Sequence, residues 1–128
     1  MRDLSINEVS DFVYEKLEVL DFEQVLTNPT KESVFPCLEL HTPLKSVNKT
    51  YNAFPILSTF QVSITCYNES QRECMEMTYE VDEKLQELNF VRTNTSPSIY
   101  DPITKKYGIT IFYEVRFNGI TETFEFIK

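Results

Sequence analysis

The sequence predicts an α+β fold, in which two amphipathic helices pack on one face of an antiparallel or mixed β-sheet. Two segments carry apolar residues at steps of three and four, as in half-buried helices. Other segments alternate apolar with polar residues, as in half-buried strands. Since 128 residues suit one domain, we expect a single domain over residues 1–128.

The first helix is predicted over residues 6–20. Ser5 and Glu8 have the spacing of a capping box, in which each side chain satisfies a backbone N–H of the other residue. The apolar positions that follow form one stripe: Ile6, Val9, Val13, Leu17 and Leu20.

Three strands are predicted between the helices. The first covers residues 22–27, and the second covers residues 34–40 and either begins at Pro36 or lies at a sheet edge, because proline has no N–H to donate. The third, over residues 57–67, alternates most clearly. Its apolar face consists of Phe60, Val62, Ile64 and Cys66.

The second helix is predicted to begin at another capping box, Ser70 with Glu73, and to end near Asn89. Its apolar stripe is Cys74, Met77, Val81, Leu85 and Leu88. Its outward face is expected to be acidic and to carry Glu73, Glu76, Glu80, Asp82, Glu83 and Glu87.

After a strand that begins at residues 90–92, residues 107–117 alternate without interruption. Asn118-Gly119 then predicts a two-residue type I′ turn, which requires positive φ at both central residues. That turn sets a register with four predicted pairs: Phe117 with Ile120, Val115 with Glu122, Tyr113 with Phe124 and Ile111 with Phe126.

Two segments, residues 41–55 and 94–106, show no period and are predicted to be long surface loops. Loops of this length in a compact domain are usually functional or disordered. Residues 43–55 and 94–106 hold Lys45, Lys49, Lys105 and Lys106, together with three aromatic residues that the core pattern leaves over: Tyr51, Phe54 and Tyr100.

The composition excludes several classes of function. The net charge of −8 and the pI of about 4.6 oppose binding to a nucleic-acid backbone, which needs Lys and Arg to neutralise phosphates. Two glycines are too few for a Gly-rich phosphate loop. Three cysteines without a CxxC pair or an apolar leader indicate free thiols in a reducing cytoplasm, and the sequons at Asn48, Asn68 and Asn94 are read as chance matches.

Residues for catalysis are scarce, and we expect no enzyme activity, no cofactor and no metal. His41 is the single histidine, and it is predicted to be a solvated loop residue. Cys66 and Cys74 lie on predicted apolar faces, where free cysteine packs as a small hydrophobe. The carboxylates lie mostly on solvent faces of helices, whereas acid–base catalysis needs them in a cleft.

The order of elements resembles the tail terminator, or tail completion, proteins of long-tailed bacteriophages. The similar patterns are Phe35-Pro36-Cys37-Leu38-Glu39-Leu40 after the first helix, the strand 60–67 running directly into a second helix, and Leu88-Asn89-Phe90 at the end of that helix. The family commonly has Leu-Gly-Phe at this last place. Asn89 departs from it but also tolerates the left-handed conformation.

The resemblance implies a structural virion subunit of the tail or neck, assembled in the host cytoplasm. Such proteins form hexameric rings on the last ring of the tail tube protein, stop tail growth and join the head through a connector or stopper protein. Genomic DNA passes through the lumen without specific binding, and an acidic wall suits that passage. Two alternatives remain: a head–tail joining or stopper neck protein, and a monomeric intracellular adaptor for a basic partner.

A ring requires two complementary patches on each protomer. We expect the basic and aromatic residues of the two predicted loops to contact the acidic face of the second helix on a neighbouring subunit or a tube rim. The residues predicted for this interface are Lys45, Lys49, Tyr51, Phe54, Tyr100, Lys105, Lys106, Glu76, Glu80, Glu83 and Glu87.

Overall fold

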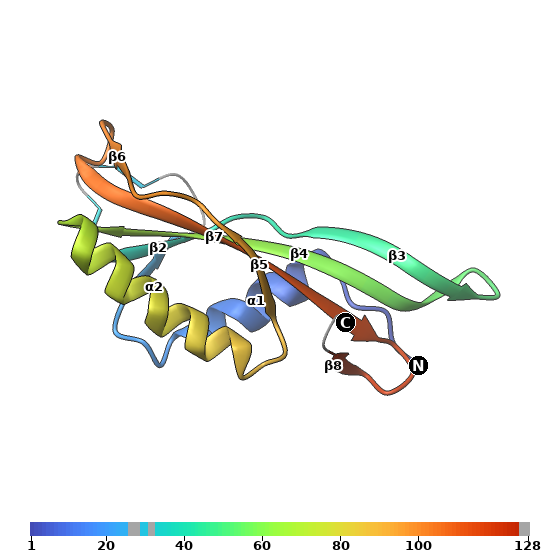
Figure 1. Cartoon of the computed structure of the whole chain (residues 1–128). Helices are drawn as coiled ribbons and strands as arrows, with labels where there is room; N and C mark the ends of the chain where they lie inside the picture. The colour runs from blue at the N-terminus through green and yellow to red at the C-terminus, as the bar shows by residue number, and fades with distance from the viewer. Residues whose placement is uncertain (26–28, 31–32, 126–128) are drawn as a thin grey trace.

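A computed structural model describes residues 1–25, 29–30 and 33–125. In this part of the chain, two helices and an eight-stranded mixed sheet confirm the predicted α+β class (Figure 1). The helices are α1 (Ile6–Leu17) and α2 (Gln71–Gln86). The strands are β1 (Glu23–Val25), β2 (Cys37–Leu40), β3 (Leu44–Tyr51), β4 (Phe54–Asn68), β5 (Val91–Thr95), β6 (Ile99–Asp101), β7 (Lys106–Asn118) and β8 (Thr123–Glu125).

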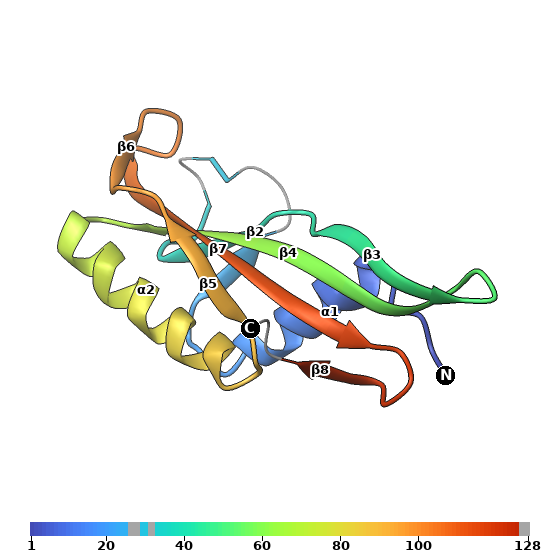
Figure 2. The same ribbon diagram turned by 45° about the vertical axis from the view of Figure 1, so that its right-hand side comes forward.

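The sheet is built around the antiparallel pair β4 and β7, which runs from Leu57 opposite Asn118 to Asn68 opposite Tyr107. Its main order is β1-β2-β4-β7-β5, with β3 also paired to β4, and with β6 and β8 paired to β7. Only β1 and β2 pair in parallel among these strands. Both helices lie on one face of the sheet, and no described helix covers the other face, here named the open face (Figure 2).

Local capping explains where the helices begin and end. The capping box of Ser5 and Glu8 is complete. The box predicted for Ser70 and Glu73 is half formed: the Ser70 side chain accepts from the backbone N–H of Glu73, but the Glu73 side chain does not accept from the backbone N–H of Ser70. The first helix ends at Leu17, three residues earlier than predicted. After it, the backbone N–H groups of Glu18 and Leu20 donate to carbonyls three residues earlier, as in a 3₁₀ turn. After α2, Asn89 adopts a φ of 69°, which supports the predicted end of the helix.

The core lies between the helices and the alternating strands. In β4 the predicted apolar face is buried, and in β7 the residues Ile109, Ile111, Tyr113, Val115 and Phe117 are buried. They pack against the apolar stripes of both helices, including Val9, Val13, Leu17, Met77, Val81 and Leu85. Each fully buried aliphatic side chain of this size contributes about 1.5–3 kcal/mol relative to an exposed one.

The predicted loop over residues 41–55 is wrong, because most of it forms strand β3. A two-residue turn at Asn52 and Ala53, with φ of 49° and 66°, joins β3 to β4, and Tyr51 pairs with Phe54 across it. Positive φ at both central residues is the requirement of a type I′ turn. Most residues of β3 are exposed on both faces, so its side chains carry no alternation that a sequence pattern could detect.

The second predicted loop, residues 94–106, is wrong for a related reason. Strand β5 extends to Thr95, and β6 forms a short hairpin with β7, in which Tyr100 pairs with Tyr107. Asp101 closes this hairpin by accepting hydrogen bonds from the backbone N–H of Ile103 and the hydroxyl of Thr104. These strands are short and largely exposed, and their partner β7 lies later in the chain.

The register predicted for the last hairpin is also wrong. Phe117 pairs with Phe124 and Asn118 with Thr123, so four residues form the connection, and Glu122 rather than Gly119 has positive φ. This excludes the predicted pairs of Phe117 with Ile120, Val115 with Glu122 and Tyr113 with Phe124. The pair of Ile111 with Phe126 lies outside the described residues.

The cause of this register is tertiary. The N–H of Gly119 donates to the carbonyl of Ile56 at 2.9 Å, and the carbonyl of Gly119 accepts from the N–H of Arg2 at 2.8 Å. A Cβ on Gly119 would lie 2.5 Å from the Arg2 carbonyl oxygen. Glycine is therefore required here for a close approach of three segments.

Two smaller predictions are refined. The strand predicted over residues 34–40 begins at Cys37, directly after Pro36, and it lies between β1 and β4 rather than at an edge. The strand predicted over residues 22–27 spans Glu23–Val25, and its last two predicted residues lie outside the described part of the chain. No helix in the described ranges is long and apolar enough to cross a membrane.

Candidate interaction surfaces

The hairpin of β3 and β4 extends past the helices at one end of the molecule (Figure 1). Two apolar side chains of β3, Val47 and Tyr51, are 48% and 63% exposed, and Lys49 is exposed between them. Phe54, the partner of Tyr51 across the turn, is half-buried. This arm presents apolar and basic groups that its own core does not cover.

The outer face of α2 is acidic, as predicted, with one exception. Glu76, Glu80, Glu83 and Glu87 are all exposed. Two large apolar side chains, Met75 and Tyr79, are exposed on the same helix at 51% and 65%. Asp82, which was predicted to face outward, is instead buried against the sheet, where its carboxylate accepts a hydrogen bond from the Tyr113 hydroxyl.

The predicted interface lysines fall into two groups. The ammonium of Lys45 lies 2.6 Å from the Asp3 carboxylate and donates to the Leu4 carbonyl, so this lysine holds the N-terminal segment against β3. Lys106 pairs with Glu69 at 3.6 Å and lies over the ring of Phe35. Both positive charges are therefore engaged within the chain.

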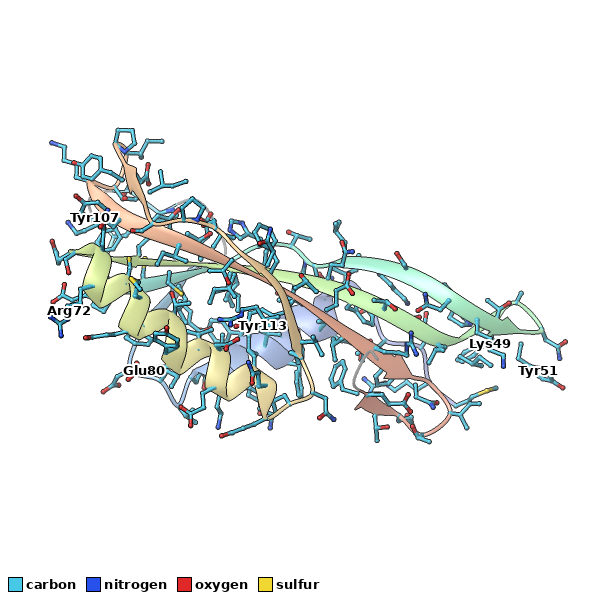
Figure 3. The ribbon with its side chains drawn as sticks, viewed as in Figure 1. Lys49, Tyr51, Arg72, Glu80, Tyr107 and Tyr113 are labelled. Carbon is cyan, nitrogen blue, oxygen red and sulfur yellow. The ribbon has the colours of Figure 1, made fainter. Side chains whose placement is uncertain are left out.

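Lys49 and Lys105 are exposed, and neither forms an ion pair with a described residue. Tyr100 is 51% exposed and packs edge-on against Tyr107 at 5.5 Å between ring centroids. The two segments predicted to share an interface are not neighbours: β3 and β6 lie towards opposite ends of the sheet (Figures 1 and 2). Figure 3 likewise places Lys49 and Tyr51 at the end opposite Arg72 and Glu80.

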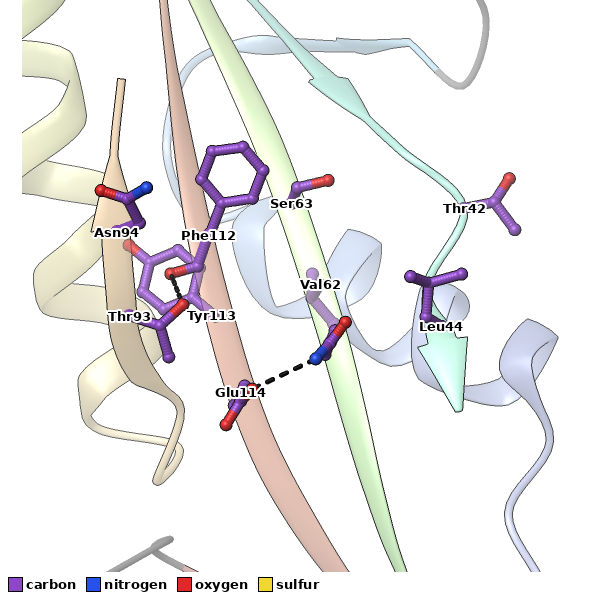
Figure 4. Close-up of a pocket in the computed structure, with 10 residues that line it drawn as sticks. Thr42, Leu44, Val62, Ser63, Thr93, Asn94, Phe112, Tyr113 and Glu114 are labelled. Atoms are coloured by element: carbon purple, nitrogen blue, oxygen red, sulfur yellow. Dashed lines mark hydrogen bonds between the residues drawn. The ribbon is translucent and has the colours of Figure 1, made fainter. Parts of the chain in front are cut away.

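The open face of the sheet is hollowed by two adjoining depressions, and Ser63 and Phe112 line both. The first, of about 470 Å³, lies between Leu44 on β3 and Asn94 on β5 (Figure 4). Across its floor the Gln61 side-chain amide donates to the Glu114 carboxylate at 3.2 Å. Among the described residues, Glu114 is the one charged residue that lines this depression.

The second depression, of about 630 Å³, is bounded by β2, β4, β6 and β7. The Tyr67 hydroxyl donates to the carboxylate of Glu39 at 3.0 Å, and the ring Nε2 of His41 lies 2.7 Å from the Thr65 hydroxyl oxygen. Burial raises the pKa of the Tyr67 phenol, and the negative charge of Glu39 raises it further. His41 lies between β2 and β3, in a connection as predicted, but its side chain is only 37% exposed and belongs to a polar network.

The three cysteines are free and buried, as predicted. Burial raises the pKa of the Cys37 and Cys66 thiols to about 12 and that of Cys74 to about 11. Such thiols are protonated at neutral pH and are poor nucleophiles. Within the described ranges, no three His, Cys, Asp or Glu side chains are grouped so as to hold a metal ion.

Sequence reasoning missed the groups of the second depression. Glu39 lies in an apolar run, and its neighbour Tyr67 is 28 positions away, so only the pairing of β2 with β4 brings them together. One feature of the sequence could have indicated them. Glu39 lies between Leu38 and Leu40 in a strand, and because successive side chains face opposite sides of a sheet, it is expected on the face opposite the core, in a polar contact.

No family model matches this sequence, and no curated protein matches it.

Proposed function

We propose that this chain is a structural subunit that assembles head to tail into a ring, and that the ring caps the end of a phage tail tube, as the resemblance to tail terminators implies. The observation that carries the proposal is the projecting hairpin of β3 and β4. It presents exposed Tyr51 and Lys49 at one end of the protomer, opposite the acidic α2 face at the other end.

The chemistry of the two patches is complementary. The hairpin from residue 44 to residue 55 contains no acidic residue, and its Lys49 forms no ion pair with a described residue, whereas the outer face of α2 presents Glu76, Glu80, Glu83 and Glu87. Met75 and Tyr79 offer an apolar centre for the Tyr51 ring, and charged groups at the rim fix orientation and register. Complementary patches at opposite ends of one protomer favour a heterologous contact, which closes into a ring when the rotation allows.

Lys45 and Lys106 form ion pairs within the chain, and so do Glu76 with Arg72 and Glu87 with Lys84. The predicted interface is therefore narrowed to the residues without such pairs in the described ranges, which are Lys49, Tyr51, Phe54, Tyr100, Lys105, Glu80 and Glu83. Tyr100 and Lys105 project from the β6 end, which is also the end where α2 begins. Tyr100 and Lys105 are therefore part of the patch that includes the acidic face of α2, and Lys49 and Tyr51 form the opposite patch on the hairpin arm.

Native mass spectrometry of the full chain tests the assembly. We expect an oligomer that Lys49→Glu weakens, that Lys49→Arg preserves, and that Lys49→Glu combined with Glu80→Lys restores. Tyr51→Ser is expected to yield a folded monomer. A wild-type chain that stays monomeric at every concentration it tolerates would rule out the ring and favour the monomeric adaptor.

The position in the virion needs a separate measurement. Electron micrographs of tails assembled with the Tyr51→Ser variant should show uncontrolled tail lengths if the protein stops tube growth. Tails of normal length that fail to join heads would instead assign the chain to the head–tail joining or stopper class.

A further inference from the structure

The second depression of the open face has negative charge at its floor and aromatic walls. We name it the carboxylate–aromatic pocket and define it by Glu39, Tyr67, Tyr100, Asp101 and Phe112. It lies on the face opposite both helices and does not include the hairpin arm or the outer face of α2. Of its five defining residues, Tyr100 also belongs to the proposed ring interface, and the other four do not.

Glu39 is a largely buried carboxylate with one close hydrogen-bond donor, Tyr67, among the described residues. The residue is 5% exposed. Of the described residues, Tyr67 and His41 contact its carboxylate, and both do so at Oε1, at 3.0 Å and 3.9 Å. No described residue donates a hydrogen bond to Oε2. This oxygen is not among the buried atoms of the described residues that lack a partner, so it is accessible from the depression. A cation that reaches it would pair with a carboxylate that is otherwise largely removed from water.

The surrounding groups suit a cation and not an anion. The carboxylate of Asp101 is held by the backbone N–H of Ile103 and the Thr104 hydroxyl, and its charge acts on Tyr67 together with that of Glu39. Two negative charges at one depression repel phosphate and carboxylate ligands. The same field attracts an ammonium or guanidinium group.

The walls suit the apolar stem of a long cationic side chain. Phe112 and Tyr100 are 39% and 51% exposed, and Ile99, which also lines the depression, is 58% exposed. Aromatic faces attract cations within about 6 Å of the ring centroid, and methylene groups pack well against them. The depression, at about 630 Å³, also has room for backbone on either side of such a side chain.

We infer that the carboxylate–aromatic pocket binds a lysine or arginine side chain of a protein partner, with the cationic head at Glu39 and the stem against Phe112 and Tyr100. This contact is separate from the acidic face of α2.

Nuclear magnetic resonance titration of the ¹⁵N-labelled full chain tests this inference. The probe is a tripeptide, Gly-Lys-Gly, capped at both ends, and the matched control replaces its lysine with norleucine, which keeps the stem and removes the charge. We expect the lysine peptide to shift the amide signals of Thr65, Gly108 and Thr110, which line the pocket. The norleucine peptide should bind at least about tenfold more weakly, the usual scale for loss of a charge-assisted hydrogen bond.

Variants locate the binding. Glu39→Gln keeps an acceptor for the Tyr67 hydroxyl but removes the charge, and we expect it to lower the affinity about tenfold. Glu114→Gln, in the neighbouring depression, should bind as the wild type does. Tyr100→Ala changes a half-exposed side chain, so it should fold normally and bind several-fold more weakly.

Several outcomes would overturn the inference: no signal shifts, equal affinity for the norleucine peptide, unchanged affinity in Glu39→Gln, or shifts confined to α2. A last arm uses n-butylammonium chloride. If it binds as tightly as the lysine peptide and the flanking backbone adds nothing, the pocket is a small-amine site and the protein partner is rejected.

Discussion

The hydroxyl of Tyr113, in the middle of β7, donates a 2.8 Å hydrogen bond to the Asp82 carboxylate on α2. Tyr113 is 1% exposed and Asp82 is 8% exposed. The other carboxylate oxygen accepts from the Gln86 side chain at 2.8 Å and lies 3.5 Å from the Arg92 guanidinium. Burial and the Asp82 hydrogen bond raise the pKa of the Tyr113 phenol, so it stays a neutral donor that joins helix to sheet.

Replacing Tyr113 with Phe should lower the free energy of unfolding by about 1–3 kcal/mol, because a buried carboxylate loses one of its donors. Urea denaturation measures the change. Tyr79→Phe is the control: it removes the hydroxyl of a 65% exposed tyrosine on α2, the helix of Asp82, and should change the free energy of unfolding by less than about 0.5 kcal/mol. Equal effects of the two substitutions would show that the buried hydrogen bond contributes nothing.

Replacing Gly119 with Ala should destabilise the protein by about 1–3 kcal/mol, because the new Cβ would lie 2.5 Å from the Arg2 carbonyl oxygen and the backbone would have to move. Gly108→Ala is the control. Its Cβ would meet the Tyr67 ring at 3.2 Å, and a side chain yields more easily than a backbone. The thermal midpoint should fall further in Gly119→Ala than in Gly108→Ala. If Gly119→Ala leaves the midpoint unchanged, the N-terminal segment is not held at this connection.

Replacing Ala53 with Gly should stabilise the hairpin of β3 and β4 by about 1 kcal/mol, because alanine at a φ of 66° carries a steric cost that glycine lacks. Thermal unfolding measures the gain. Asn89 has a similar φ of 69°, but its side-chain amide donates to the Phe124 carbonyl. Asn89→Gly should therefore raise the thermal midpoint less than Ala53→Gly does, or lower it. A larger gain in Asn89→Gly than in Ala53→Gly would contradict this account of the turn.

The buried thiols predict how stability depends on pH. The pKa of each thiol is raised in the folded protein, so the folded state keeps protons that the unfolded state loses once the pH exceeds about 8.5. The stabilisation is complete below that value and is lost as the pH rises towards about 11 to 12. Urea midpoints measured between pH 8 and pH 10 should fall, and Cys66→Ala should reduce the slope relative to the wild type.

Thiol labelling checks the same burial at neutral pH. An aromatic disulfide reagent should react slowly with the native protein, because only an accessible thiolate attacks. In urea, where the protein is unfolded, the reagent should react with all three cysteines. Rapid native labelling of one cysteine would locate a part of the core that opens.

The sequence by itself determined the two helices and the two long central strands. Their periodicity reports a buried face that each segment carries in its own residues, and the Ser5 and Ser70 caps mark the helix starts with local hydrogen bonds. The predicted acidic face of α2 followed from the same periodicity. The periodicity placed Asp82 on the wrong face. Asp82 lies at the border of the buried stripe, where the position of a charged side chain depends on its partner, and that partner, Tyr113, is 31 residues away.

Only the tertiary structure decided the hairpin arm, the last register and the carboxylate–aromatic pocket. The exposed side chains of β3 have no inner and outer face to alternate between, so its pairing with β4 comes from backbone hydrogen bonds and the turn at Asn52 and Ala53. The register after β7 follows from the hydrogen bonds that Gly119 makes to Arg2 and Ile56. Glu39 meets Tyr67 because antiparallel pairing of β2 with β4 places them on one face, and such long-range pairing leaves no local pattern in the chain.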